Sequence, residues 1–133
     1  MRTLILYLEN GEKFDSAKLL NDLRSIKGTF DINGENFAES TVACEFRYHG
    51  DLATLRLQGE PDALSIEGIG KAGLKLAWEL HIGDKRVFRV TDGDYAFDFS
   101  LRDIKSLEEF KKKISERHYD SVSQERTELI TAA

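Results

Sequence analysis

Three glycines with a lysine among them form the pattern in this sequence that most suggests ligand binding. Gly68, Gly70 and Gly73 have the spacing G-x-G-x-x-G, and Lys71 follows the second glycine directly. In nucleotide-binding proteins such glycines bring the backbone close to a phosphate group, which binds at the amino end of the following helix. The same glycines can instead shape the entry into a helix and let that helix pack closely on a sheet.

The surrounding residues favour the packing interpretation. In dinucleotide-binding proteins the motif follows a parallel strand, and an acid about twenty residues later ends the next parallel strand. Here the patterns before and after the motif indicate antiparallel hairpins. A small-ligand, nucleotide or phosphate site at this helix end is therefore an alternative function, and its residues are Gly68, Gly70, Lys71 and Gly73.

No set of side chains matches a catalytic or metal-binding motif. The three histidines are far apart in the sequence, and neither a zinc-binding spacing nor a nucleophile elbow occurs. Asp31 begins a stretch like a calcium loop, but its glycine comes one place early and Val42 stands where the last bidentate acid belongs. The sequence predicts no catalytic residue, no metal and no cofactor. It favours a non-enzymatic protein and leaves open a shallow active site built from loops.

Acidic side chains are concentrated in one part of the chain. The net charge is −5, and residues 28–67 alone hold eight acidic and two basic side chains, a net charge of −6. Nucleic-acid binding needs clustered Lys and Arg, so this balance argues against it and favours a basic protein partner. The main hypothesis is a non-enzymatic protein-binding module of the inhibitor, immunity or antitoxin kind. Its expected contact residues are Glu35, Glu39, Glu45, Asp51, Glu60, Asp62 and Glu67.

Length and composition indicate one globular domain. The chain has 133 residues, of which 41% are hydrophobic and 32% charged. We predict a single α+β domain over residues 1–118 and a flexible tail over residues 119–133. No stretch has the roughly 20 apolar residues that cross a bilayer, and no signal-peptide pattern occurs, so we expect a cytoplasmic protein. Cys44, the single cysteine, lies in an alternating apolar run and is expected to be buried in the core.

In the first part of the chain, apolar spacing predicts a strand, a helix and a hairpin. Residues 4–8 are apolar at nearly every position, which is typical of a central strand covered on both faces. Asp15 can cap a helix whose apolar stripe ends before Gly28. Asn33-Gly34 is a hairpin turn signal that would pair Phe30 with Phe37.

The middle of the chain alternates and then changes to helical spacing. Residues 42–66 read as an antiparallel meander of three strands with one face toward water, turning at His49-Gly50 or Gly50-Asp51. Residues 68–82 have the spacing of a helix, near whose end the dipole favours a positive charge on His81.

The last part predicts a hairpin and a third helix. In residues 85–101 an Asp92-Gly93 turn would pair Val90 with Tyr95 and Phe88 with Phe97. Ser106 and Glu109 then form a capping box.

The resulting order is β-α-β-β-β-α-β-β-α, with an antiparallel or mixed sheet and helices on one face. This order resembles an elaborated split β-α-β, or ferredoxin-like, arrangement, which hosts many unrelated functions. A symmetric homodimer through a strand edge or through the helix with Trp78 is a further alternative.

Overall fold

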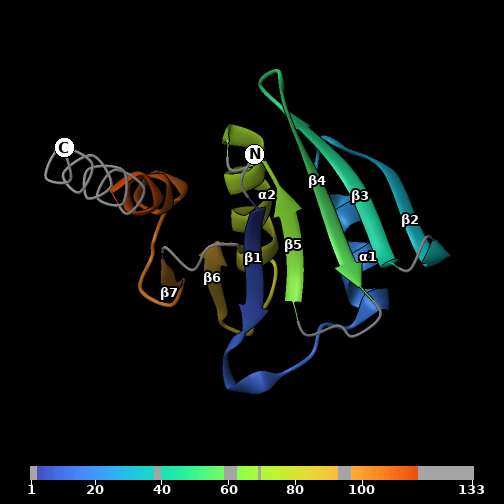
Figure 1. Ribbon diagram of the computed structural model, residues 1–133, viewed down its shortest axis with the longest axis horizontal. Coiled ribbons are helices and arrows are strands. Elements are labelled where there is room, and N and C mark those ends of the chain that lie inside the picture. The colour runs from blue at the N-terminus through green and yellow to red at the C-terminus, as the bar shows by residue number, and fades with distance from the viewer. Residues whose placement is uncertain (1–2, 38–39, 59–62, 69, 93–96, 117–133) are drawn as a thin grey trace, which may run out of the picture.

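The computed structural model describes residues 3–37, 40–58, 63–68, 70–92 and 97–116, which form one seven-stranded sheet with helices against it (Figure 1). In chain order its elements are β1 (Thr3–Leu8), the short 3-10 turn η1 (Glu9–Gly11), α1 (Ser16–Ser25), β2 (Thr29–Phe37), β3 (Ser40–Tyr48), β4 (Asp51–Gln58), β5 (Ala63–Glu67), α2 (Lys71–Ile82), β6 (Phe88–Asp92), β7 (Asp98–Ser100) and a C-terminal helix described over residues 107–116. None of the helices in these ranges has the length and apolarity needed to cross a membrane.

All neighbouring strands in the sheet are antiparallel. Their order is β2-β3-β4-β5-β1-β6-β7, so β1 is an interior strand with a neighbour on each side, although β5 is the middle one. β5 and β6 both run antiparallel to β1 and are connected through α2, so they are parallel to each other with β1 between them. The α+β class is confirmed. The strand count is not, because four strands separate α1 from α2 where the sequence predicted three.

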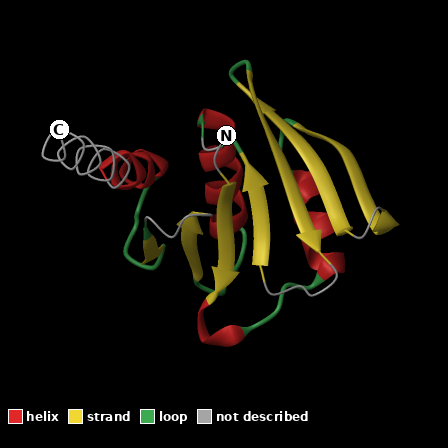
Figure 2. Ribbon diagram, viewed as in Figure 1, coloured by secondary structure: helices red, strands yellow, loops and turns green. Residues whose placement is uncertain are grey.

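The two faces of the sheet differ. α1 and α2 lie against one face (Figure 2), and the aliphatic side chains of Leu4, Leu6 and Leu8 point into the core there. Ile5 and Tyr7 alternate with them on the opposite face, called the open face below, and both are only half-buried. The prediction that β1 is covered on both faces is therefore wrong: its second apolar set faces water.

The Asn33-Gly34 dipeptide does not form a turn. Both residues lie within β2, where they pair with Ala43 and Val42 of β3. A Cβ atom on Gly34 would lie 2.5 Å from Cδ1 of Leu20 on α1. Gly34 is needed because α1 packs closely over this point of β2. In the sequence, an Asn-Gly pair that makes room for a helix looks the same as one that forms a hairpin turn.

The β6–β7 hairpin has a different register from the predicted one. Val90 pairs with Phe99 and Thr91 with Asp98, so the pairing is shifted by four residues and the connection is longer than two residues. Asp92 is not a turn residue but the last residue of β6, paired with Leu4 and 1% exposed. Because the shift is even, the same side chains still face the core.

The predicted caps are found at two helices. Asp15 accepts a hydrogen bond from the Ala17 amide (3.0 Å) at the start of α1. Ser106 accepts one from the Glu109 amide (3.1 Å) before the C-terminal helix, whose Phe110 side chain is fully buried. The predicted tail, residues 119–133, and residue His118 lie outside the described ranges.

Candidate functional site

The glycine motif lies where α2 begins, and a carboxylate of the protein already binds there. Oδ2 of Asp51 accepts a hydrogen bond from the Ala72 amide at 2.9 Å. A Cβ on Gly70 would lie 2.6 Å from the same Oδ2, and a Cβ on Gly73 would overlap the carbonyl oxygen of Gly68. Close packing thus accounts for Gly70 and Gly73. A phosphate at this helix end would have to displace the carboxylate of Asp51.

Two of the expected contact acids lie on the open face. Glu45 and Glu67 flank Thr54 across neighbouring strands. Oε2 of Glu45 accepts a hydrogen bond from the Thr54 hydroxyl at 2.8 Å, and Glu67 forms a 2.8 Å ion pair with Arg56. The Arg56 and Glu67 side chains are 41% and 43% exposed. Both acids therefore face water while keeping a partner within the sheet.

Of the remaining expected acids, Asp51 alone has a side chain that the structure describes, and it lies elsewhere. Asp51 caps α2 on the opposite face of the sheet. The side chain of Glu35 is outside the described part of the structure, as are Glu39, Glu60 and Asp62. The strand ends that lead to them are described: Ser40 pairs with Gln58, so the chain enters segments 38–39 and 59–62 from the same end of the sheet.

Two large apolar side chains accompany the acids on the open face. Phe30 pairs with Glu45 and is 37% exposed, and Leu52 pairs with Arg47 and is 48% exposed. The Arg47 guanidinium lies 5.5 Å from the centroid of the Phe30 ring. Exposed apolar groups with a polar rim are typical of a protein-binding surface.

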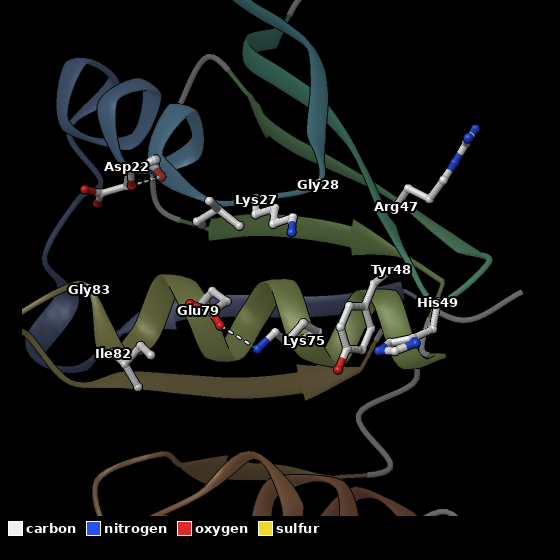
Figure 3. A pocket seen from close by; sticks show the side chains of 12 residues that line it. Asp22, Lys27, Gly28, Arg47, Tyr48, His49, Lys75, Glu79, Ile82 and Gly83 are labelled. Carbon is white, nitrogen blue, oxygen red and sulfur yellow. Dashed lines mark hydrogen bonds and ion pairs between the residues drawn. The ribbon is translucent and has the colours of Figure 1, made fainter.

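A groove lies between α1 and α2 and was not predicted from the sequence (Figure 3). Its volume is about 790 Å³, within the range of small-molecule sites. It is lined by Asp22, Ser25, Ile26, Lys27, Gly28, Arg47, Tyr48, His49, Lys75, Glu79, Ile82 and Gly83.

The groove residues come from three places that are distant in sequence. Tyr48 ends β3 and His49 follows it in the turn, where the backbone of His49 and Gly50 has positive φ angles of 49° and 79°. Tyr48 pairs with Asp51 across them, so the turn is at His49-Gly50, one of the two predicted positions. Lys75 and Glu79 are one turn apart on α2 and form a 2.6 Å ion pair. The i, i+4 spacing of Lys75 and Glu79 is common on exposed helix faces, so the sequence alone did not indicate that these residues line a groove.

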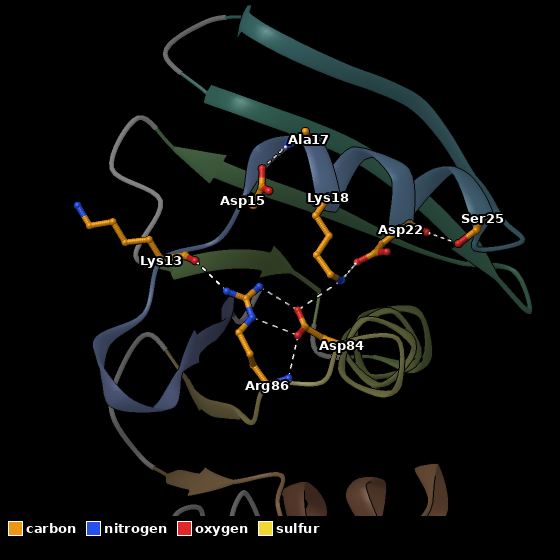
Figure 4. A network of polar contacts seen from close by, with 8 residues as sticks. All are labelled: Lys13, Asp15, Ala17, Lys18, Asp22, Ser25, Asp84 and Arg86. Carbon is orange, nitrogen blue, oxygen red and sulfur yellow. Dashed lines mark hydrogen bonds and ion pairs between the residues drawn. The ribbon is translucent and has the colours of Figure 1, made fainter.

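A buried carboxylate joins α1 to the connection between α2 and β6 (Figure 4). The side chain of Asp84 is 6% exposed and forms ion pairs with Arg86 at 3.0 Å and with Lys18 at 3.6 Å. Burial by itself would raise the pKa of Asp84, but hydrogen bonds from Arg86 and the charges of Arg86 and Lys18 outweigh it and lower the pKa. Arg86 also donates to the carbonyl of Lys13 at 3.1 Å. This network holds elements together on one side of the molecule.

Cys44 and His81 belong to the core. Cys44 is 2% exposed, as predicted, and burial raises the pKa of its thiol to about 11. The His81 ring lies 5.5 Å from the ring of Trp78 and 5.7 Å from that of Phe88, and burial lowers its pKa. Its Nδ1 atom is buried and has no hydrogen-bond partner within the described ranges. His81 lies in the last turn of α2 as predicted, but burial opposes the positive charge that the dipole favours there.

Within the ranges that the structure describes, no three His, Cys, Asp or Glu side chains could jointly hold a metal ion. Comparison with protein-family models, with curated proteins and with solved structures finds no match.

Proposed function

We propose that this chain is a non-enzymatic protein-binding module, and that its acidic residues meet a basic partner. The observation that supports this most is the open face, where Glu45 and Glu67 face water beside the exposed side chains of Phe30 and Leu52. Apolar groups can supply contact area and acids can steer a basic partner into place. We place the protein in the cytoplasm, where a lone cysteine such as Cys44 remains reduced.

The sheet edges favour recognition through the face rather than by strand addition. β2, one edge strand, has two register shifts against β3 and a positive φ angle of 49° at Asp31. β7, the other edge strand, is three residues long. Bulges and short strands are devices that prevent edge pairing.

The proposal can be tested with two sets of charge reversals. The first replaces Glu45 and Glu67 on the open face by Lys. The second is a matched control with the same change of net charge, with Lys at Glu108 and Glu116 on the C-terminal helix. A basic protein is first isolated on the wild-type chain at low salt, and its association rate is then measured by stopped flow at several salt concentrations.

We expect the first set to slow association about tenfold at low salt and to flatten its salt dependence, because steering by the acids is lost. The control set should leave both quantities near the wild-type values. Equal effects of the two sets would mean that net charge alone drives association, and this would overturn the proposal.

The alternatives have less support. A homodimer through the helix with Trp78 would need a free helix face, but Trp78 is 8% exposed and its ring lies 6.2 Å from that of Phe110. Phosphate binding at Gly68–Gly73 competes with the bond from the Ala72 amide to Asp51.

We also propose that the sheet is an elaborated split β-α-β arrangement. The unit β5-α2-β6, with β1 between its parallel strands, supports this. β3 and β4 would then be an added pair within the meander. Such a likeness bears on the fold alone and implies no activity.

A further inference from the structure

The basic groups around the groove between α1 and α2 outnumber the available acids. Both acids in its lining already have lysine partners: Asp22 pairs with Lys18 at 2.7 Å, and Glu79 with Lys75 at 2.6 Å. Lys27 lies in the same lining and has no carboxylate within ion-pair distance among the described residues. A surplus of positive charge therefore lies at this groove in a chain whose net charge is −5.

One end of the groove is aromatic and held in place. The rings of Tyr48 and His49 meet edge to face with their centroids 4.2 Å apart, and the Lys75 ammonium lies 5.6 Å from the centroid of the Tyr48 ring. The ion pair with Glu79 orients Lys75 and uses one of its three donors, so two donors remain for a ligand.

The other end of the groove is apolar. Ile82, at the end of α2, is 57% exposed, the largest exposed fraction among the exposed large hydrophobic residues of the described ranges. Ile26 lines the facing side. A ligand with an apolar body could cover these side chains while its charged group reaches the lysines.

We propose that this groove binds a small organic anion, with its acidic group between Lys27 and Lys75, beside Tyr48, and its apolar body over Ile26 and Ile82. The volume of about 790 Å³ is within the range of sites for drug-sized ligands, so a body of one or two rings has room there. The recognised chemistry is one acidic group on an apolar or aromatic body. This site is separate from the acidic residues through which we propose protein binding.

The test uses 8-anilinonaphthalene-1-sulfonate, a fluorescent aromatic anion, and N-phenyl-1-naphthylamine, its neutral counterpart without the sulfonate. Both are titrated into the full chain, and backbone amide shifts of Tyr48 and Lys75 are followed by NMR. Lys27→Glu removes the unpaired cation, and Lys112→Glu on the C-terminal helix is a control with the same change of charge. A urea titration of each variant checks that it is as stable as the wild type, because the probe also binds the exposed apolar surface of partly folded protein.

We expect one anionic probe to bind per chain and to shift the Tyr48 and Lys75 amides. Lys27→Glu should weaken its binding about tenfold, the effect of losing one charge-assisted contact. Lys112→Glu should not weaken it, and the neutral probe should bind at least about tenfold more weakly than the anion. Absence of saturable binding, equal affinity for both probes, or equal effects of the two variants would each overturn the proposal.

Competition then distinguishes the acidic groups. Displacement of the bound probe by phenyl phosphate or by phenylacetate supports a phosphate or a carboxylate ligand respectively. Equal displacement by benzyl alcohol would overturn the need for an anion.

Discussion

Replacing Gly73 by Ala separates two opposing effects on the stability of α2. Alanine in place of glycine in a helix interior stabilises by about 1 kcal/mol. In this chain, however, a Cβ on Gly73 would overlap the carbonyl oxygen of Gly68, which is backbone and cannot rotate away. Overpacking of this severity costs about 3 kcal/mol. We therefore expect a net loss of roughly 2 kcal/mol in the free energy of unfolding.

Urea denaturation followed by the fluorescence of Trp78 measures this difference. With a slope of about 2 kcal/mol per molar urea, the midpoint should fall by roughly 1 M. Gly11→Ala is the matched control, because Gly11 has a positive φ angle of 70° and a Cβ added there would meet no atom within 4 Å. It should cost about 1 kcal/mol through backbone strain alone. A Gly73→Ala chain more stable than the wild type would refute the steric argument.

Three further predictions concern the cap of α2 and two core groups. Asp51→Ala should lower the free energy of unfolding in urea by about 1 kcal/mol, whereas Asp51→Asn, which keeps an acceptor oxygen, should lower it less. The pKa of His81 is below 6.5 in the folded chain, so the unfolded chain binds this proton more readily and the free energy of unfolding should fall as the pH drops below 6.5. Urea titrations between pH 7 and 5 measure this fall, and the part due to His81 should be absent in His81→Phe. At pH 8, Cys44 should react with Ellman's reagent only after denaturation, because its pKa is about 11 and it is buried.

Patterns that depend on face were predicted well, and patterns that depend on pairing were not. The even shift in the β6–β7 register moved Val90 from Tyr95 to Phe99 and left Phe88, Val90, Phe97 and Phe99 facing the core. The alternation of apolar and polar residues determines which side chains face the core. It does not determine the pairing register, because a shift of two or four residues leaves every side chain on the same face. The length of the connection decides the slip, and Asp92-Gly93 favoured a two-residue connection that tertiary pairing with Leu4 overrides.

Single glycines were the least informative residues. Gly34 and Gly50 have similar local surroundings in sequence, yet Gly50 forms a turn and Gly34 lies in a strand beneath Leu20. The second role depends on a helix that precedes the strand by several residues. Only the three-dimensional contact distinguishes a glycine required for its backbone angles from one required for its lack of a side chain.

The predicted acidic surface divides into parts because strands carry neighbouring acids to different places. Charge counting treated Glu45, Asp51 and Glu67 as one set, but in the structure Asp51 accepts a hydrogen bond from the Ala72 amide of α2 on the opposite face of the sheet. The groove escaped prediction for the converse reason. Lys27 and Lys75 are 48 residues apart in sequence, and only the packing of α1 and α2 brings both to one lining.

The two proposed sites should act independently. Glu45 and Glu67 face water on the open face of the sheet, whereas the groove lies between α1 and α2 on its other face. Glu45 bonds to Thr54 and Glu67 pairs with Arg56, and none of these four residues lines the groove.

Effects of substitutions that share no partner usually add, and charges that face water are screened over a Debye length of about 8 Å at physiological salt. Lys27→Glu should therefore weaken the anionic probe equally in the wild type and in the variant with Lys at positions 45 and 67. That double variant should slow association with a basic partner equally with and without the probe. A departure from additivity of more than about 0.5 kcal/mol in either cycle would mean that the two surfaces are coupled.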